Sequence, residues 1–90
     1  MSKSILQPDE KECFISGSRI NLDKHHIYAG SCRQLSEKHG CWVWLRHDIH
    51  MDVHSRDISI DNYLRETCQK KFEETHTREE FRKIFGRSYL

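Results

Sequence analysis

Five of the seven histidines in this chain fall in two short stretches, and their spacing is suited to holding a metal ion. His25 and His26 are adjacent in DKHHIYAG, and His47, His50 and His54 follow in HDIHMDVH. If the second stretch is helical, His50 and His54 project from one face, one turn apart. Neutral imidazole nitrogens bind transition metals well, so His50 and His54 are predicted to coordinate one metal ion together.

Two ligands from one helix leave a metal ion undercoordinated, and the adjacent histidines on a preceding strand are the obvious source of a third. Neighbouring strand side chains point to opposite sides, so His25 and His26 do not both reach the ion easily. The second imidazole can instead face the far side of a bound phosphate and accept a proton from an attacking water. The ion would hold the phosphate and neutralise charge on the leaving oxygen. Three protein ligands leave a coordination position open, which is typical of catalytic sites.

The alternative is that these histidines are ordinary surface residues, because helical HxxxH pairs also arise on solvated faces. An apolar strand of suitable length between the two stretches favours the metal site. The remaining two histidines, His39 and His76, have polar neighbours and are expected at the surface.

Length and composition predict one small domain over residues 1–90, in which the polar residues 1–11 form a loosely held, flexible arm. The formal net charge is +1 and 32% of the residues are charged, so binding to a polyanion would depend on local patches. No apolar run approaches the roughly 20 residues of a membrane span. The N-terminal residues lack the features of a signal peptide, so we expect a cytoplasmic chain with no membrane partner.

Four cysteines are present, and no two of them form a CxxC pair: Cys13, Cys32, Cys41 and Cys68. A reducing compartment disfavours disulfides, and without a secretory signal we expect most of the four to be reduced thiols.

Hydrophobic patterning predicts an α+β fold. Residues 12–22 are expected to form a short strand, a turn and a second strand, with Cys13 to Ile15 in the first. Residues 29–40 read as a long loop with a helical turn, which Gly40 ends. CWVWL, residues 41–45, is the most β-prone run and should be a buried strand.

Two helices are expected after the histidine stretch. The longer lies within residues 57–76 and has this stripe facing the core: Tyr63, Leu64, Thr67, Cys68, Lys71 and Phe72. The shorter opens with a capping box of Thr77 and Glu80, and Gly86 ends it. Its apolar face is expected to consist of Phe81, Ile84 and Phe85.

These motifs resemble those of the HNH endonucleases, the ββα-metal or His-Me finger family. DKHHI resembles the first strand of that family, GCWVWL the second strand, and HDIHMDVH the helix that follows. The resemblance implies that His25 is a metal ligand and His26 the general base. His50 and His54 would be the helical ligands. It also implies a ββα-metal HNH core over residues 12–57, a helical tail over residues 58–90, and one divalent metal ion.

Other parts of the chain are similar to small phage HNH-type proteins, some of them associated with recombination. The residues concerned are HHIYAG, with Arg33, Ser36 and Glu37 after it, and the ending FRKIFGRSYL. This looser similarity implies a recombination or phage protein as a partner.

The chain departs from the HNH pattern at two places. Many members of the family carry two CxxC pairs around a structural zinc, whereas this sequence retains only Cys13 of them, so no structural zinc is expected. Cys41 stands where the family has its middle Asn, a residue that helps to fix the loop carrying the base.

The resemblance implies that this site hydrolyses DNA phosphodiester bonds. Three imidazoles suit Zn²⁺, Ni²⁺ or Mn²⁺ better than Mg²⁺, which prefers oxygen ligands, although phosphate oxygens of the substrate could let Mg²⁺ work. Basic residues near the site are candidates for contacts to DNA phosphates: Lys24, Arg33, Lys38, Arg46 and Arg56. A second basic group lies in the tail: Lys70, Lys71, Arg78, Arg82, Lys83 and Arg87.

Two further interpretations stay open at this point. One is a degenerate HNH fold that binds nucleic acid or a protein partner without cleaving, which the loss of the middle Asn at Cys41 supports. The other is a structural domain that a metal ion stabilises through its histidines. For the basic tail, the alternative interpretation is a solvated helix face whose basic residues pair with acidic ones.

Overall fold

Two antiparallel strands form the sheet of the computed structural model, which describes residues 3–55 and 58–90. Strand β1 (Leu22–His26) pairs with β2 (Trp42–Arg46), with His25 opposite Val43. The helices of the described residues are the short 3₁₀ helix η1 (Gly30–Cys32), α1 (Arg33–His39), α2 (His47–Ser55), α3 (Ile58–Phe72) and α4 (Arg78–Phe85). The α+β prediction is therefore confirmed.

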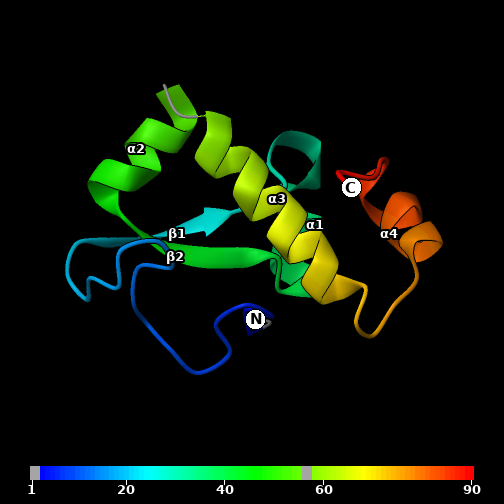
Figure 1. Cartoon of the computed structure of the whole chain (residues 1–90), viewed down its shortest axis with the longest axis horizontal. Helices are drawn as coiled ribbons and strands as arrows, with labels where there is room; N and C mark the ends of the chain where they lie inside the picture. The colour runs from blue at the N-terminus through cyan, green and yellow to red at the C-terminus, as the bar shows by residue number, and fades with distance from the viewer. Residues whose placement is uncertain (1–2, 56–57) are drawn as a thin grey trace.

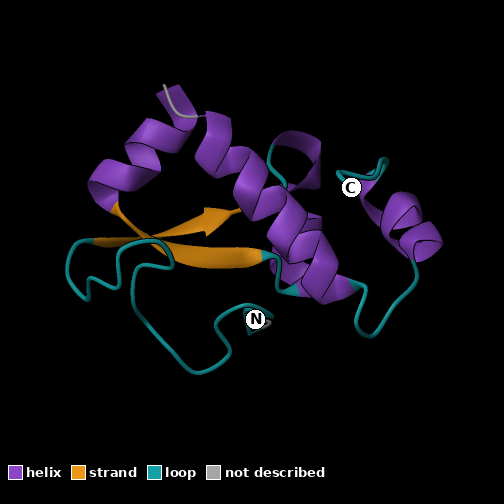
Figure 2. Cartoon of the chain, viewed as in Figure 1, coloured by secondary structure: helices purple, strands orange, loops and turns teal. Residues whose placement is uncertain are grey.

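The helices and the N-terminal loop lie on different sides of the strands. Figure 1 shows α2 and α3 running over the sheet, with α4 and the C-terminus at one end of the molecule. The N-terminal loop lies across the sheet from these two helices (Figure 2). Among the described residues, no helix is both long and apolar enough to cross a lipid bilayer.

The elements around the second histidine stretch form where the sequence predicts them. Val43 and Leu45 of β2 are fully buried, as expected for the most β-prone run of the chain. Helix α2 begins directly after β2, and the backbone N–H of His47 donates to the carbonyl of Asn21, just before β1. This contact holds the start of α2 against the start of the first strand.

Two of the expected local structures differ in the structure. Cys13 to Ile15 form a turn and no strand: the N–H of Gly17 donates to the carbonyl of Cys13, and Gly17 has a φ of 78° that favours glycine. The region 29–40 is mostly helical, because η1 and α1 occupy it up to Gly40, which ends α1 with a φ of 72°. The polar composition of this region gave little sign of a helix, and within α1 Ser36 is fully buried while Leu35 is partly buried against the core.

The N-terminal residues cover the outer edge of β2. The hydroxyl of Ser4 donates to the carbonyl of Trp42 at 2.5 Å, and the N–H of Trp44 donates to Oε1 of Gln7 at 2.9 Å. The N–H of Phe14 donates to the carbonyl of Trp44. Side chains of the expected arm thus satisfy strand groups that would otherwise be exposed at a sheet edge.

The core lies between the sheet and helices α3 and α4. Leu64, Cys68 and Phe72 recur every fourth residue along α3 and are buried, whereas Tyr63 and Lys71, which were expected on this stripe, are exposed. The four cysteines are free thiols.

Helix α4 packs its aromatic residues into the same core. Phe81 and Phe85 are buried, and Ile84 is partly buried. The predicted capping box is present, with the N–H of Glu80 donating to Thr77 and the N–H of Thr77 donating to Glu80. Gly86 ends the helix with a φ of 88°, as expected.

Candidate metal centre

Three imidazoles from two elements converge at one point. His25 comes from β1, and His50 and His54 come from α2. One ring nitrogen from each lies within 4.8 Å of the others. The centre of the His25 ring is 5.2 Å from that of His50 and 5.4 Å from that of His54. The structure therefore brings together the three residues that the sequence predicted as ligands.

The spacing of these nitrogens fits one ion. The Nε2 atoms of His50 and His54 are 3.0 Å apart. Two nitrogens each about 2.0–2.1 Å from a metal lie roughly 2.9–3.4 Å apart when the angle at the metal is between octahedral and tetrahedral. The nitrogen of His25 lies within 4.8 Å of the other two, so its ring would have to move closer to complete a three-nitrogen site.

The environment of His25 is suited to a ligand that stays neutral. The residue is 3% exposed, and its Nε2 atom is buried with no hydrogen-bond partner within residues 3–55 and 58–90. Burial, and to a smaller extent the neighbouring rings of His50 and His54, lowers the pKa of His25 to about 4. An unpaired buried nitrogen destabilises the fold, and a bound cation would satisfy it.

Asp23 fixes the orientation of one of these rings. Its Oδ2 atom accepts hydrogen bonds from Nδ1 of His50 at 3.0 Å and from Nδ1 of His47 at 2.7 Å. These bonds, with the one from His50 the larger cause, hold the pKa of Asp23 below its usual range. Because Nδ1 of His50 carries the proton, its Nε2 lone pair is available to a metal.

Sequence reasoning did not single out Asp23. One signal could have found it: Asp23 lies two residues before His25 on the same strand, so the two side chains share a face of the sheet.

His26 lies on the other face of β1 from its neighbour. Its Nε2 atom is 3.0 Å from Oε1 of Glu37 on α1, and Nζ of Lys24 lies 3.2 Å from the same oxygen. The hydrogen bond with His26, and then the one with Lys24, lowers the pKa of Glu37, so its carboxylate stays ionised. Glu37 therefore holds His26 with the Nε2–H tautomer and directs Nδ1 away from α1.

The loop that follows His26 is fixed by a serine of α1. Ser36 is fully buried, accepts from the N–H of Tyr28 at 3.1 Å and donates to the carbonyl of Tyr28 at 2.7 Å. Cys41, at the position where the resemblance places an Asn, is fully buried, and its thiol makes a weak contact of 3.9 Å to the carbonyl of His39. Ser36 therefore holds this loop through its side chain, whereas Cys41 holds it through its backbone carbonyl, which accepts from the N–H of Ile27 at 3.0 Å.

Both faces of β1 open onto one pocket of about 340 Å³. It is lined by Lys24, His25, His26, Ala29, Gly30, Arg33, His50 and His54. Of the predicted phosphate contacts, Lys24 and the exposed Arg33 line this pocket. Lys38 is exposed on α1. His25 and His26 lie on opposite sides of β1, yet both line this pocket and can therefore contact one bound ligand.

The other predicted phosphate contacts do not line this pocket. Arg46 lines a separate hollow beside Asp23 and His47, and it pairs with Asp48 at 3.1 Å. Arg56 lies outside the described residues.

The two histidines expected at the surface are placed differently from one another. His76 is exposed and stacks on the ring of Phe72, with ring centres 4.1 Å apart. His39 is partly buried near the same ring, and its burial lowers its pKa. Neither lies in the pocket of the three converging imidazoles.

Comparison of the chain with protein-family models, curated proteins and solved structures gives no match. Three imidazoles can hold a divalent cation, a fourth imidazole fixed by a carboxylate can accept a proton, and basic side chains beside them can contact an anion.

Proposed function

We propose that this protein is a metal-dependent endonuclease of the HNH, or ββα-metal, type that hydrolyses DNA phosphodiester bonds. The observation that carries the proposal is the shared pocket of the three converging histidines and His26. Ligands and base come from one strand and the helix that follows the sheet, and both face the same space. A metal site beside a general base is one arrangement that supports hydrolysis of a phosphate ester.

The metal ligands in this proposal are His25, His50 and His54, each through one ring nitrogen. A divalent cation there would hold a phosphate oxygen and offset the charge that develops on the leaving oxygen. Three neutral nitrogens favour Zn²⁺, Ni²⁺ or Mn²⁺, and Mg²⁺ would depend on oxygens of the substrate and water. The unpaired, buried nitrogen of His25 supports a resident ion.

His26 is the general base in this proposal. With its Nε2–H donated to Glu37, the Nδ1 lone pair can take a proton from the attacking water. Glu37 also stabilises the imidazolium that forms, because a nearby carboxylate favours the charged ring. The buried hydrogen bonds of Ser36 keep the following loop in place.

Phosphates of the substrate would be bound by Arg33 at the pocket rim, with Lys24 beside His26. Contacts of this kind position the backbone and carry no sequence information, so we expect little sequence preference. Lys24 contributes less positive charge than Arg33, because Glu37 is close to it.

A second function, binding of nucleic acid or of a recombination or phage protein without cleavage, is favoured by one observation. The buried side chain of Cys41 makes no strong hydrogen bond to the loop of the base, which Cys41 contacts only through its backbone carbonyl within the described residues. If Ser36 does not replace the missing Asn in holding this loop, the base would be misplaced and only binding would remain.

A plasmid-nicking assay with Mn²⁺, Ni²⁺ or Mg²⁺ tests the proposal. The wild type should nick, chelator should abolish nicking, and His26→Ala should lower the rate by about 10²–10⁴-fold while it still binds metal and DNA. His76→Ala is the matched control, because it removes an exposed imidazole outside the site, and it should nick as the wild type does.

The other outcomes separate the remaining interpretations. DNA binding without cleavage in wild type and His26→Ala supports the second function. Unfolding on removal of metal, with no DNA binding by either protein, supports a structural role for the ion. Equal nicking by wild type and His26→Ala would show that the base is wrongly assigned.

A further inference from the structure

The structure divides the basic residues of the tail into those that pair with acids and those that do not. Lys71 pairs with Glu74 at 3.1 Å, and Arg78 pairs with Glu73 at 3.0 Å. Arg87 makes no ion pair with any residue that the structure describes, and its guanidinium lies 4.8 Å from the ring centre of Tyr89. Lys70, Arg82 and Lys83 likewise make no ion pair within the described residues. Arg87 is the candidate among them for binding an external anion, because it also lines a polar pocket.

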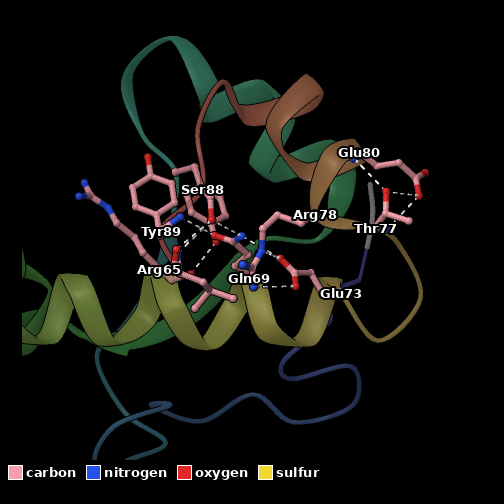
Figure 3. A network of polar contacts seen from close by, with 10 residues as sticks. Arg65, Gln69, Glu73, Thr77, Arg78, Glu80, Ser88 and Tyr89 are labelled. Carbon is pink, nitrogen blue, oxygen red and sulfur yellow. Dashed lines mark hydrogen bonds and ion pairs between the residues drawn. The ribbon is translucent and has the colours of Figure 1, made fainter.

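The segment that carries Arg87 is held firmly on α3. Gln69 is fully buried, donates to the hydroxyl of Ser88 at 2.9 Å and accepts from the N–H of Tyr89 at 2.7 Å. Figure 3 shows this contact, with Arg65 beside the ring of Tyr89. The guanidinium carbon of Arg65 is 5.5 Å from the centre of that ring. The ring thus has two guanidinium groups near it.

A polar pocket of about 350 Å³ opens at this place. It is lined by Asn62, Arg65, Glu66, Arg87, Ser88, Tyr89 and Leu90. Asp61 already neutralises part of Arg65, through an ion pair of 3.0 Å. Glu66 opposes an anion, so the amide and hydroxyl groups and Arg87 must provide the attraction. If an anion binds here, removing the negative charge of Glu66 should strengthen its binding.

This pocket adjoins the elements that carry the metal centre. The hydroxyl of Tyr28, two residues after His26, donates to the carbonyl of Arg65 at 2.7 Å. The thiol of Cys32, next to Arg33, lies 3.7 Å from the carbonyl of Phe85. The charge of Arg65 is also near enough to contribute to the lowered pKa of His25. Arg33 at the first pocket and Arg87 at the second therefore lie on neighbouring segments.

We propose that the pocket between α3 and residues 87–90 binds a backbone phosphate of the DNA, one that lies beyond the phosphate at the metal centre. The proposal rests on the proposed function, because it takes the same nucleic acid as the ligand of both pockets. The contact adds affinity without sequence readout.

The test is the salt dependence of binding to a short DNA duplex, measured in the His26→Ala background so that the DNA stays intact. Arg87→Ala should weaken binding and reduce the slope of log K against log salt by about 1. Arg87→Lys should restore most of the slope. Glu66→Gln should tighten binding. The matched control is Arg19→Ala, which removes the same charge from the exposed loop before β1, far from the C-terminus (Figure 1), and should change the slope less.

Two results would overturn this proposal: Arg87→Ala and Arg19→Ala changing the slope equally, or Glu66→Gln leaving binding unchanged or weaker. If Arg87→Ala alone reduces the salt slope but the wild type never nicks DNA, the nuclease proposal is wrong and the phosphate pocket is supported. If the wild type nicks DNA but Arg87→Ala leaves the salt slope unchanged, the phosphate pocket is wrong and the nuclease proposal is supported. A protein that binds no DNA overturns both.

Discussion

Replacing Asp23 by Asn should weaken metal binding although Asp23 is no ligand. Its Oδ2 atom accepts the Nδ1 proton of His50 at 3.0 Å and so keeps Nε2 free for the ion. An amide removes the negative charge, weakens this hydrogen bond and lowers the basicity of the ligating nitrogen. Loss of such a supporting carboxylate costs about 10–100-fold in metal affinity, or about 1.4–2.7 kcal/mol.

The structure places the expected effect at the lower end of that range. The side chain of Asp23 is 34% exposed, so solvent screens part of its charge. His47 shares the same oxygen at 2.7 Å, so His50 receives only part of its interaction. We therefore expect a loss of roughly tenfold for Asp23→Asn. His47→Ala should keep the wild-type affinity or raise it, because it leaves the carboxylate to His50 alone.

Metal affinity can be measured by titrating apoprotein with Zn²⁺ in competition with a chromophoric chelator, with circular dichroism to verify folding. Asp48→Asn is the matched control, because it removes an equal charge from an exposed side chain in the first turn of α2. If Asp23→Asn binds Zn²⁺ as tightly as Asp48→Asn, the carboxylate does not support the site and the argument for its role is wrong.

Three further predictions concern stability, each measured by thermal unfolding. Ser36→Ala leaves both backbone groups of Tyr28 without their partner in the core and should cost about 1–3 kcal/mol; an unchanged midpoint would show that water replaces the hydroxyl. Thr77→Ala removes the cap of α4 and should cost about 1 kcal/mol, or roughly 4–8 °C, whereas Thr67→Ala should cost less. Hydrogen bonds from Thr77 hold the pKa of Glu80 below its usual value in the folded state. The contribution of the Glu80 carboxylate to folding stability is therefore present above about pH 4.3, the pKa of an unperturbed Glu, and is lost as the pH falls through the folded pKa. Glu80→Gln should therefore flatten the acid limb of the stability profile; an unaltered limb would contradict this.

Elements with strong local signals could be predicted from the sequence. The apolar run of β2, the four-residue spacing of the α2 histidines, and the caps of α4 at Thr77 and Gly86 are set by neighbours in the chain. The expectation failed where the local signal was ambiguous. Cys13 to Ile15 are β-compatible but form a turn, and residues 29–40 are polar but mostly helical.

Supporting contacts of the site were harder to predict, because they join residues that are distant in the chain. Asp23 and His50 are 27 residues apart, and His26 and Glu37 are 11 apart. A strand pattern places Asp23 and His25 on one face, but it does not indicate which helix will cover that face.

The sequence by itself determined the chemistry available to this protein: imidazoles at His50 and His54 one helical turn apart, and two more on a strand that must point to opposite sides. Only the tertiary structure decided that His25 faces α2 and that His26 faces Glu37. The reason is that alternation along a strand fixes relative directions, whereas the buried face is chosen by the packing of α2 and α3 against the whole sheet. That choice made His25 the desolvated, unpaired imidazole and left His26 paired with a carboxylate.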